Sequence, residues 1–192
     1  MPPKIKTTKE NIIDAAFSIT REEGADKLNA RSLAARLGCS VQPIFRAFRS
    51  MDDVKAAVFQ RVVDFYQEFL MSRVSMEDAL VGLEMAYIQF AREEKHLFKL
   101  LHMSDRMELE EMSDFADVGI NKQVVEVMAA MMKLPIEQAK ELYKGTFFAA
   151  HGIASIIATN HGEFDNEEIQ KIMDNVFYGL VMRIQSQNSQ KD

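Results

Sequence analysis

The sequence predicts an all-α protein with a small N-terminal helical domain and a larger C-terminal helical bundle. Only eight Gly and four Pro interrupt the 192 residues, so strong helix breakers are sparse. No long alternation of apolar and polar residues indicates β-strands. Apolar residues instead recur every three or four positions, as on one face of a helix, and their 47% share excludes a chain too polar to form a core.

The first helix is expected to start near Thr7, because Thr7 and Glu10 have the spacing of a capping box. Ile13 and Phe17 then fall on one face of this helix. Gly24 follows, and it can end the helix in a left-handed conformation.

Two short helices are expected next. Asn29 is a good N-cap for the first of them, and Gly38 stops it after two turns. Ser40 is expected to cap the second, over residues 41–47. Pro43 lies near the start of that helix, where a backbone N–H has no intrahelical partner, so its missing donor costs little.

A long fourth helix is expected from Ser50, followed by a series of helices in the rest of the chain. Residues 104–117 show the weakest periodicity and predict a loop or a short helix, and the polar tail from Gln185 onward is expected to fray. The later helices are expected over residues 76–92, 93–101, 118–133, 136–161 and 167–187.

The two short helices, their three-residue turn and the helix before them have the pattern of a helix-turn-helix unit. In such units the second short helix enters the major groove of DNA. Val41, Gln42 and Arg46 are expected to face outward, while Ile44 and Phe48 face inward. Gln pairs with adenine, Arg with guanine or phosphate, and Val contacts a thymine methyl group.

The charge distribution agrees with this division of the chain. The formal net charge of −6 argues against a nucleic-acid partner when it is taken as a whole. Residues 1–50 nevertheless hold nine basic and five acidic groups, whereas residues 51–192 hold 14 basic and 24 acidic groups. A positive N-terminal segment can therefore face phosphate while a negative body is held away from it.

Residues 30–54, ARSLAARLGCSVQPIFRAFRSMDDV, resemble the DNA-binding segment of TetR/AcrR-type transcriptional regulators. Residues 37–40 match the turn, Phe48 matches the closing Phe, and the likeness covers residues 6–66 with its motif at about 30–49. Phe45 stands where the family usually has Tyr, and so lacks a hydroxyl for phosphate. Met51 replaces a Lys that often helps to hold the DNA backbone.

The resemblance implies a homodimer that binds a pseudo-palindromic double-stranded DNA operator, and a C-terminal domain over residues 67–192 that binds a small apolar effector and dimerises. The function expected is that of a ligand-responsive transcriptional regulator, with repression favoured. Contacts with DNA are expected from Lys6, Arg31, Ser40, Val41, Gln42, Pro43, Phe45, Arg46, Arg49 and Lys55.

The C-terminal part carries further candidates. Residues 147–154 resemble a subgroup of the family with an aromatic residue and then His-Gly in its penultimate long helix, although Phe147 stands where that subgroup often has Trp. The effector pocket is expected to involve Phe98, His102, Met128, Met131, Met132, Phe147 and His151. The last two helices are expected to form a four-helix dimer interface through Ile153, Ile156, Ile157, Val176, Phe177, Leu180 and Ile184.

Other classes of protein are less well supported. Glu93 and His96 have a spacing used by di-iron bundles, but no second such pair follows, so no metal and no cofactor are expected. The four His have no partners at a spacing that builds a catalytic site, so no enzyme is expected. One Cys and the lack of a membrane-spanning stretch favour the cytoplasm. The alternative that stays open is an all-α carrier of apolar molecules without a DNA function.

Overall fold

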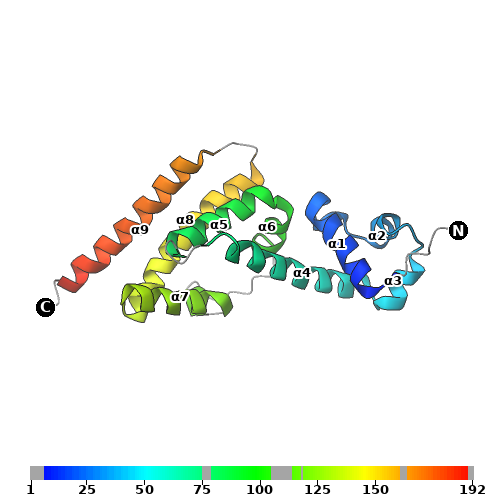
Figure 1. The fold of residues 1–192 in the computed structure, drawn as a ribbon, viewed down its shortest axis with the longest axis horizontal. Helices are drawn as coiled ribbons and strands as arrows, with labels where there is room; N and C mark the ends of the chain where they lie inside the picture. The colour runs from blue at the N-terminus through cyan, green and yellow to red at the C-terminus, as the bar shows by residue number, and fades with distance from the viewer. Residues whose placement is uncertain (1–6, 75–78, 105–113, 118, 161–163, 190–192) are drawn as a thin grey trace. The chain divides into compact units, whose positions relative to one another are not determined.

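The computed structural model describes residues 7–74, 79–104, 114–117, 119–160 and 164–189. Within these ranges all regular secondary structure is helical, which confirms the all-α prediction. Two 3₁₀ helices, Ala25–Lys27 and Asp114–Asp117, accompany the α-helices (Figure 1). The α-helices are α1 (Lys9–Glu23), α2 (Ala30–Arg36), α3 (Gln42–Ala47), α4 (Met51–Met71), α5 (Ala79–Glu93), α6 (Lys95–His102), α7 (Gly119–Met132), α8 (Ile136–Thr159) and α9 (Asn166–Ser189).

The chain divides into two compact units, of which the first, here called the head, comprises Met1–Met71 and Glu93–Arg106. In the head α1 packs on α2, α4 and α6, and α6 also packs on α4. Ile12, Ile44 and Phe98 are fully buried there. Helix α6 therefore belongs to the same compact unit as the first four helices, although it follows them after a long interval of sequence.

The caps of the first helices differ partly from the expected ones. The N-cap of α1 is Thr8, whose Oγ1 accepts a hydrogen bond from the Asn11 backbone N–H at 3.2 Å, so the prediction of Thr7 was wrong by one residue. Gly24 ends α1 with φ +98° and ψ 157°, which is a positive φ but not the left-handed helical conformation. Asn29 caps α2 as expected, since its Oδ1 accepts from two backbone N–H groups at 3.0 Å.

The start of α3 also corrects the sequence interpretation. Val41 is the N-cap of α3 and no side chain caps the helix, so the predicted Ser40 cap was wrong. Pro43 lies in the first turn, where it removes no intrahelical hydrogen bond. The next helix begins as predicted, because the Asp53 backbone N–H donates to Ser50 Oγ at 3.2 Å.

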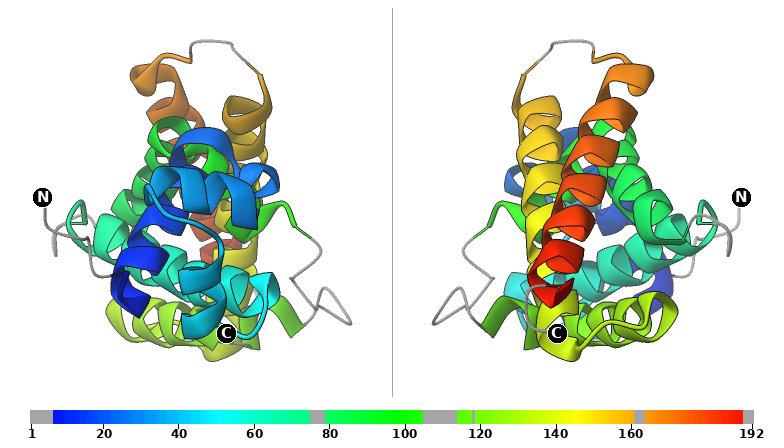
Figure 2. Two further views of the ribbon diagram at one scale, coloured as in Figure 1. Left: turned by 90° about the vertical axis from the view of Figure 1, so that its right-hand side faces the viewer. Right: turned by 90° about the vertical axis from the view of Figure 1, so that its left-hand side faces the viewer.

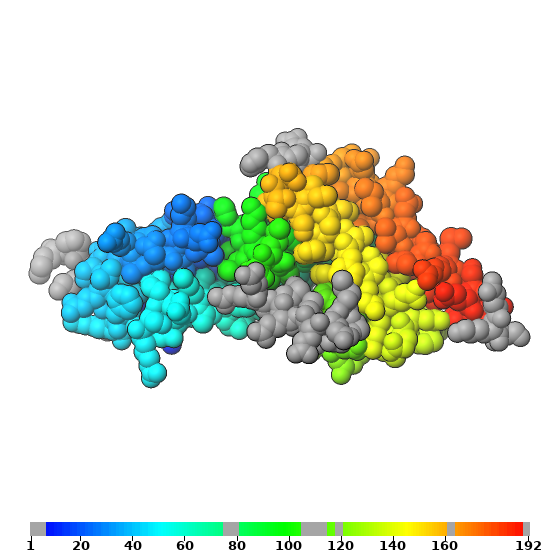
Figure 3. Space-filling view, turned by 180° about the vertical axis from the view of Figure 1, so that it is seen from behind, coloured from blue at the N-terminus to red at the C-terminus, as the bar shows by residue number. Residues whose placement is uncertain are grey.

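The second unit, here called the body, comprises Ser72–Arg92 and Met107–Asp192. Helix α8 packs on α7 and on α9, and α8 and α9 run side by side (Figures 2 and 3). Helix α9 continues to Ser189, so the predicted fraying from Gln185 was wrong. Gln138 and Asn188 explain this difference, because the Gln138 Nε2 donates to Asn188 Oδ1 at 2.6 Å and ties the end of α9 to α8.

None of the helices in the described ranges combines the length and the apolar character that crossing a bilayer requires.

Candidate functional site

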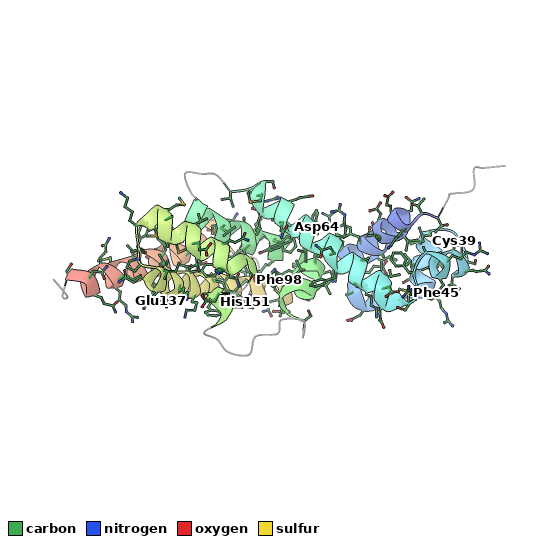
Figure 4. All side chains as sticks on the ribbon, turned by 90° about the horizontal axis from the view of Figure 1, so that it is seen from below. Cys39, Phe45, Asp64, Phe98, Glu137 and His151 are labelled. Carbon is green, nitrogen blue, oxygen red and sulfur yellow. The ribbon has the colours of Figure 1, made fainter. Side chains whose placement is uncertain are left out.

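Helix α3 has one buried and one exposed side. Ile44 and Phe48 are buried in the head, which fixes the rotation of this short helix. Val41 and Phe45 are 40% and 45% exposed, and Gln42 is exposed beside them. The expected orientation of the helix is therefore confirmed, and Phe45 can be located in Figure 4.

Three arginines near α3 are exposed, and their guanidinium groups form no ion pair among the described residues, namely Arg31, Arg46 and Arg49. Arg36 differs from them, because its guanidinium contacts Glu22 at 2.9 Å and Glu23 at 3.0 Å. The remaining candidates for DNA contact are distributed as follows: Ser40 is exposed, Pro43 is half-buried, Lys55 Nζ lies 4.0 Å from Asp52 Oδ1, and Lys6 lies outside the described residues.

An ion pair between a half-exposed arginine and a buried carboxylate holds α6 against α1 within the head. The Arg21 Nε donates to Glu94 Oε2 at 2.8 Å, and a second guanidinium nitrogen of Arg21 contacts the other carboxylate oxygen. Glu94 is only 6% exposed and precedes α6 as its N-cap. At the same junction a Cβ added to Gly24 would lie 3.1 Å from His96 Nδ1. Sequence reasoning missed this pair, since 73 residues separate its members.

A second buried carboxyl group lies in the body. Glu84 of α5 is 6% exposed, and its hydrogen-bond partner is Thr146 of α8. Burial raises the pKa of Glu84 to about 7, and the hydrogen bond from Thr146 opposes this rise. Sequence reasoning missed Glu84 too, although a signal existed, because it is the one charged residue in the apolar stretch 79–91.

An aromatic cluster in the body includes two of the predicted effector residues. The hydroxyl of Tyr87 lies 2.7 Å from His151 Nδ1, and the His151 ring stacks on Phe147 with centroids 5.8 Å apart. Burial lowers the pKa of His151, which favours its neutral form. The structure thus brings Phe147 and His151 together, and Figure 4 shows the place of His151 on α8.

The other predicted effector residues are dispersed. Met128 is buried in the core of the body, Met132 packs against that core, and Met131 is exposed. Phe98 and His102 lie on α6 in the head, with ring centroids 5.1 Å apart. The body has a half-open pocket of about 430 Å³ between α5 and α9, and its lining contains none of the seven predicted effector residues. It is lined by Arg73, Val81, Gly82, Met85, Ala86, Gln89, Gln170, Asp174 and Tyr178.

The predicted dimer-interface residues separate into three sets. Ile157, Phe177 and Ile184 are buried in the body's own core, so they are not accessible to a second copy. Ile156 is 46% exposed. The remaining three, Ile153, Val176 and Leu180, are half-buried. The large apolar side chains that α8 and α9 do expose are Ile136, Phe148, Ile156, Ile172, Tyr178 and Met182.

The described residues contain no group of three or more His, Cys, Asp or Glu side chains arranged to hold a metal ion. His96 lies beside Gly24 at the junction of α1 and α6. Cys39 is half-buried in the turn between α2 and α3.

No family model matches this sequence, and no curated protein sequence matches it. A solved structure does share its fold, the crystal structure of the multidrug binding protein EbrR complexed with imidazole. The TM-score is 0.53 at 14% sequence identity, and the alignment covers 92% of this chain and 97% of that chain. At this identity the likeness concerns the fold alone, and on that basis the chain has a TetR-like all-α fold.

Proposed function

We propose that the protein is a ligand-responsive, DNA-binding transcriptional repressor that acts as a homodimer. The observation that carries the proposal is the orientation of α3. Ile44 and Phe48 anchor it in the head, while Gln42 and Arg46 stand exposed one helical turn apart. A helix held in this way can enter the major groove and present both side chains to base edges.

The charges around α3 support the same function. Arg31, Arg46 and Arg49 are exposed and are not neutralised by acidic side chains in the described part of the head. Arg36, which two glutamates neutralise, is a poorer phosphate ligand. Each phosphate contact releases counterions, and it steepens the slope of log affinity against log salt concentration by about one.

The exposed apolar side chains of α8 and α9 support dimerisation. Phe148 and Ile156 lie two helical turns apart on α8, and Ile172 and Met182 are exposed on α9. Two copies that pack these faces together would form a four-helix interface. A dimer of this kind reads two half-sites about 34–36 Å apart, or a multiple of that spacing.

The body supports a response to a small ligand. Its half-open pocket of about 430 Å³ between α5 and α9 lies within the size range of small-molecule sites. The fold is that of a protein described as multidrug binding. The effector is expected to bind more tightly to the dimer arrangement that does not fit the operator. The resulting loss of operator affinity is limited by the ratio of the effector's affinities for the two dimer arrangements.

The test uses the full-length protein and DNA selected from a library of random duplexes of roughly 30 base pairs, which spans two half-sites. The Arg46→Glu variant is expected to lose at least about 100-fold in affinity for the selected duplex, since it places a carboxylate against phosphate or a base edge. Lys122→Glu, the same charge reversal at an exposed position of α7, serves as the matched control and is expected to bind like the wild type.

Two outcomes would contradict the proposal. Sequence-specific binding retained by Arg46→Glu would exclude α3 as the recognition helix. Absence of any salt-dependent DNA binding by the wild type would favour the carrier of apolar molecules instead. A duplex with one half-site is expected to bind much more weakly than the full operator, because it engages one head of the dimer.

A further inference from the structure

The exposed surface at α3 carries two parallel stripes of different chemistry. Val41 and Phe45 are four residues apart and form an apolar stripe, and both side chains are about two-fifths exposed. Gln42 and Arg46, also four residues apart, form a polar stripe beside it. Residues at this spacing lie on the same side of a helix, so the two stripes run together along α3.

The side chains of the apolar stripe lie outside the buried core of the head. Ile44 and Phe48 already supply the contacts that anchor the helix. Phe45 makes no aromatic contact with another ring in the described part of the chain. Single exposed apolar residues are common on proteins and need no explanation. Val41 and Phe45 differ from such single residues, because they form a pair beside exposed arginines on a helix that fits a DNA groove. This combination favours a partner that carries an apolar group close to phosphate groups.

The major groove offers one such base-specific group, the C5-methyl group of thymine. The side chains of Val41 and Phe45 contain no hydrogen-bond donor or acceptor, so they cannot read the polar edges of bases. Positions one helical turn apart are separated by about 5.4 Å, whereas successive bases rise by about 3.4 Å. The stripe can therefore reach methyl groups that are one or two base steps apart.

We propose that the apolar stripe formed by Val41 and Phe45 reads two thymine methyl groups in each operator half-site. This inference rests on the proposed DNA-binding function and adds its base specificity. Gln42 and Arg46 form hydrogen bonds with the neighbouring base edges, and the stripe favours thymine over cytosine at the two methyl-bearing positions.

The test replaces individual thymines of the selected operator by deoxyuridine, which removes only the methyl group and preserves every hydrogen bond. Burial of one methyl-sized group contributes about 0.8 kcal/mol, so each replacement at a contacted position is expected to weaken binding about fourfold. In Phe45→Ala or Val41→Ala protein, the penalty at one of the two positions is expected to disappear. Met71→Ala, which alters another exposed apolar residue of the head, is expected to keep both penalties.

The outcomes separate this inference from the proposed function. Tight, sequence-specific binding to an operator whose deoxyuridine form binds equally well would overturn the reading of methyl groups and leave DNA binding intact. Failure of the wild type to select any sequence would overturn the proposed function itself. If an alanine variant did not fold, which circular dichroism would show, the deoxyuridine series on wild-type protein would still decide the question.

Discussion

Two glutamates show how differently the head and the body accommodate a buried carboxyl group. Glu94 in the head and Glu84 in the body are both 6% exposed, and they are only ten positions apart in the sequence. Glu94 is held by both ends of the Arg21 guanidinium. Glu84 has the neutral hydroxyl of Thr146 within reach, and this hydroxyl also lies 3.1 Å from the Tyr143 backbone oxygen. The same burial is thus combined with an opposite charge in one unit and with a neutral partner in the other.

The partner decides what the carboxyl group does. A bidentate guanidinium offsets much of the cost of removing a carboxylate from water, and its planar geometry fixes the elements it joins. In the head it fixes α6 against α1. A single hydroxyl offsets far less, so burial raises the pKa of Glu84 to about 7. The body therefore holds a carboxyl group that changes charge near neutral pH, whereas the head holds a carboxylate paired with a guanidinium.

The largest expected effect follows from Glu84→Gln. The pKa of Glu84 is about 7 in the folded chain, against an ordinary value of 4.5 for a glutamate. The folded state therefore binds this proton more tightly, and the free energy of unfolding falls as pH rises from 4.5 to about 7. At about 1.36 kcal/mol per pKa unit, this one group accounts for a fall of about 3 kcal/mol. Urea unfolding at a fixed protein concentration should show that Glu84→Gln lacks this part of the pH dependence.

Glu94→Gln is the matched control for that prediction. It removes the same charge from an equally buried position, but it breaks the ion pair with Arg21, so it is expected to destabilise the protein at neutral pH. Glu84→Gln is expected to gain stability relative to the wild type as the pH rises. If the free energies of unfolding of Glu84→Gln and the wild type changed in parallel with pH, the pKa of Glu84 would be the same in the folded and unfolded states.

The next effect concerns the ion pair in the head. Removing one partner of a buried pair typically costs about 3–5 kcal/mol. Arg21 is 47% exposed and partly screened by water, so Arg21→Met is expected to cost about 1–2 kcal/mol in the free energy of unfolding. Arg36→Met is the comparison, because Arg36 pairs with the exposed Glu22 and Glu23. It is expected to cause no measurable loss in urea unfolding. Equal losses in the two variants would show that the burial of Glu94 adds nothing to the pair.

The helices and the orientation of α3 could be predicted from the sequence because both depend on local patterns. Apolar spacing identifies Ile44 and Phe48 as buried, and Asn29 caps the residues that follow it directly. The Thr8 cap shows the limit of such reasoning. Two adjacent threonines are almost equivalent in the sequence, and the structure places the second one at the cap.

The buried polar groups could not be predicted in the same way. Arg21 and Glu94 meet only because α6 folds back onto α1, and no local pattern connects residues 73 positions apart. The last two helices present a related difficulty. Ile157, Phe177 and Ile184 are apolar like Ile156, and only the packing of α8 on α9 decides that Ile156 is exposed while the other three are buried. Composition alone does not distinguish the outward faces of these helices from their buried faces.

The smallest expected effect comes from Thr146→Val, which keeps the shape of a fully buried side chain and removes its hydroxyl. The Thr146 hydroxyl has one proton and two acceptors in reach, the Glu84 carboxylate and the Tyr143 backbone oxygen at 3.1 Å. If the proton goes to Glu84, its loss raises the pKa of Glu84 further and costs about 1 kcal/mol where that group is ionised. Urea unfolding across the same pH range would then show the fall in stability continuing to higher pH. If the proton goes instead to Tyr143, the fall in the free energy of unfolding would end at the same pH as in the wild type. Burial alone would then account for the raised pKa of Glu84.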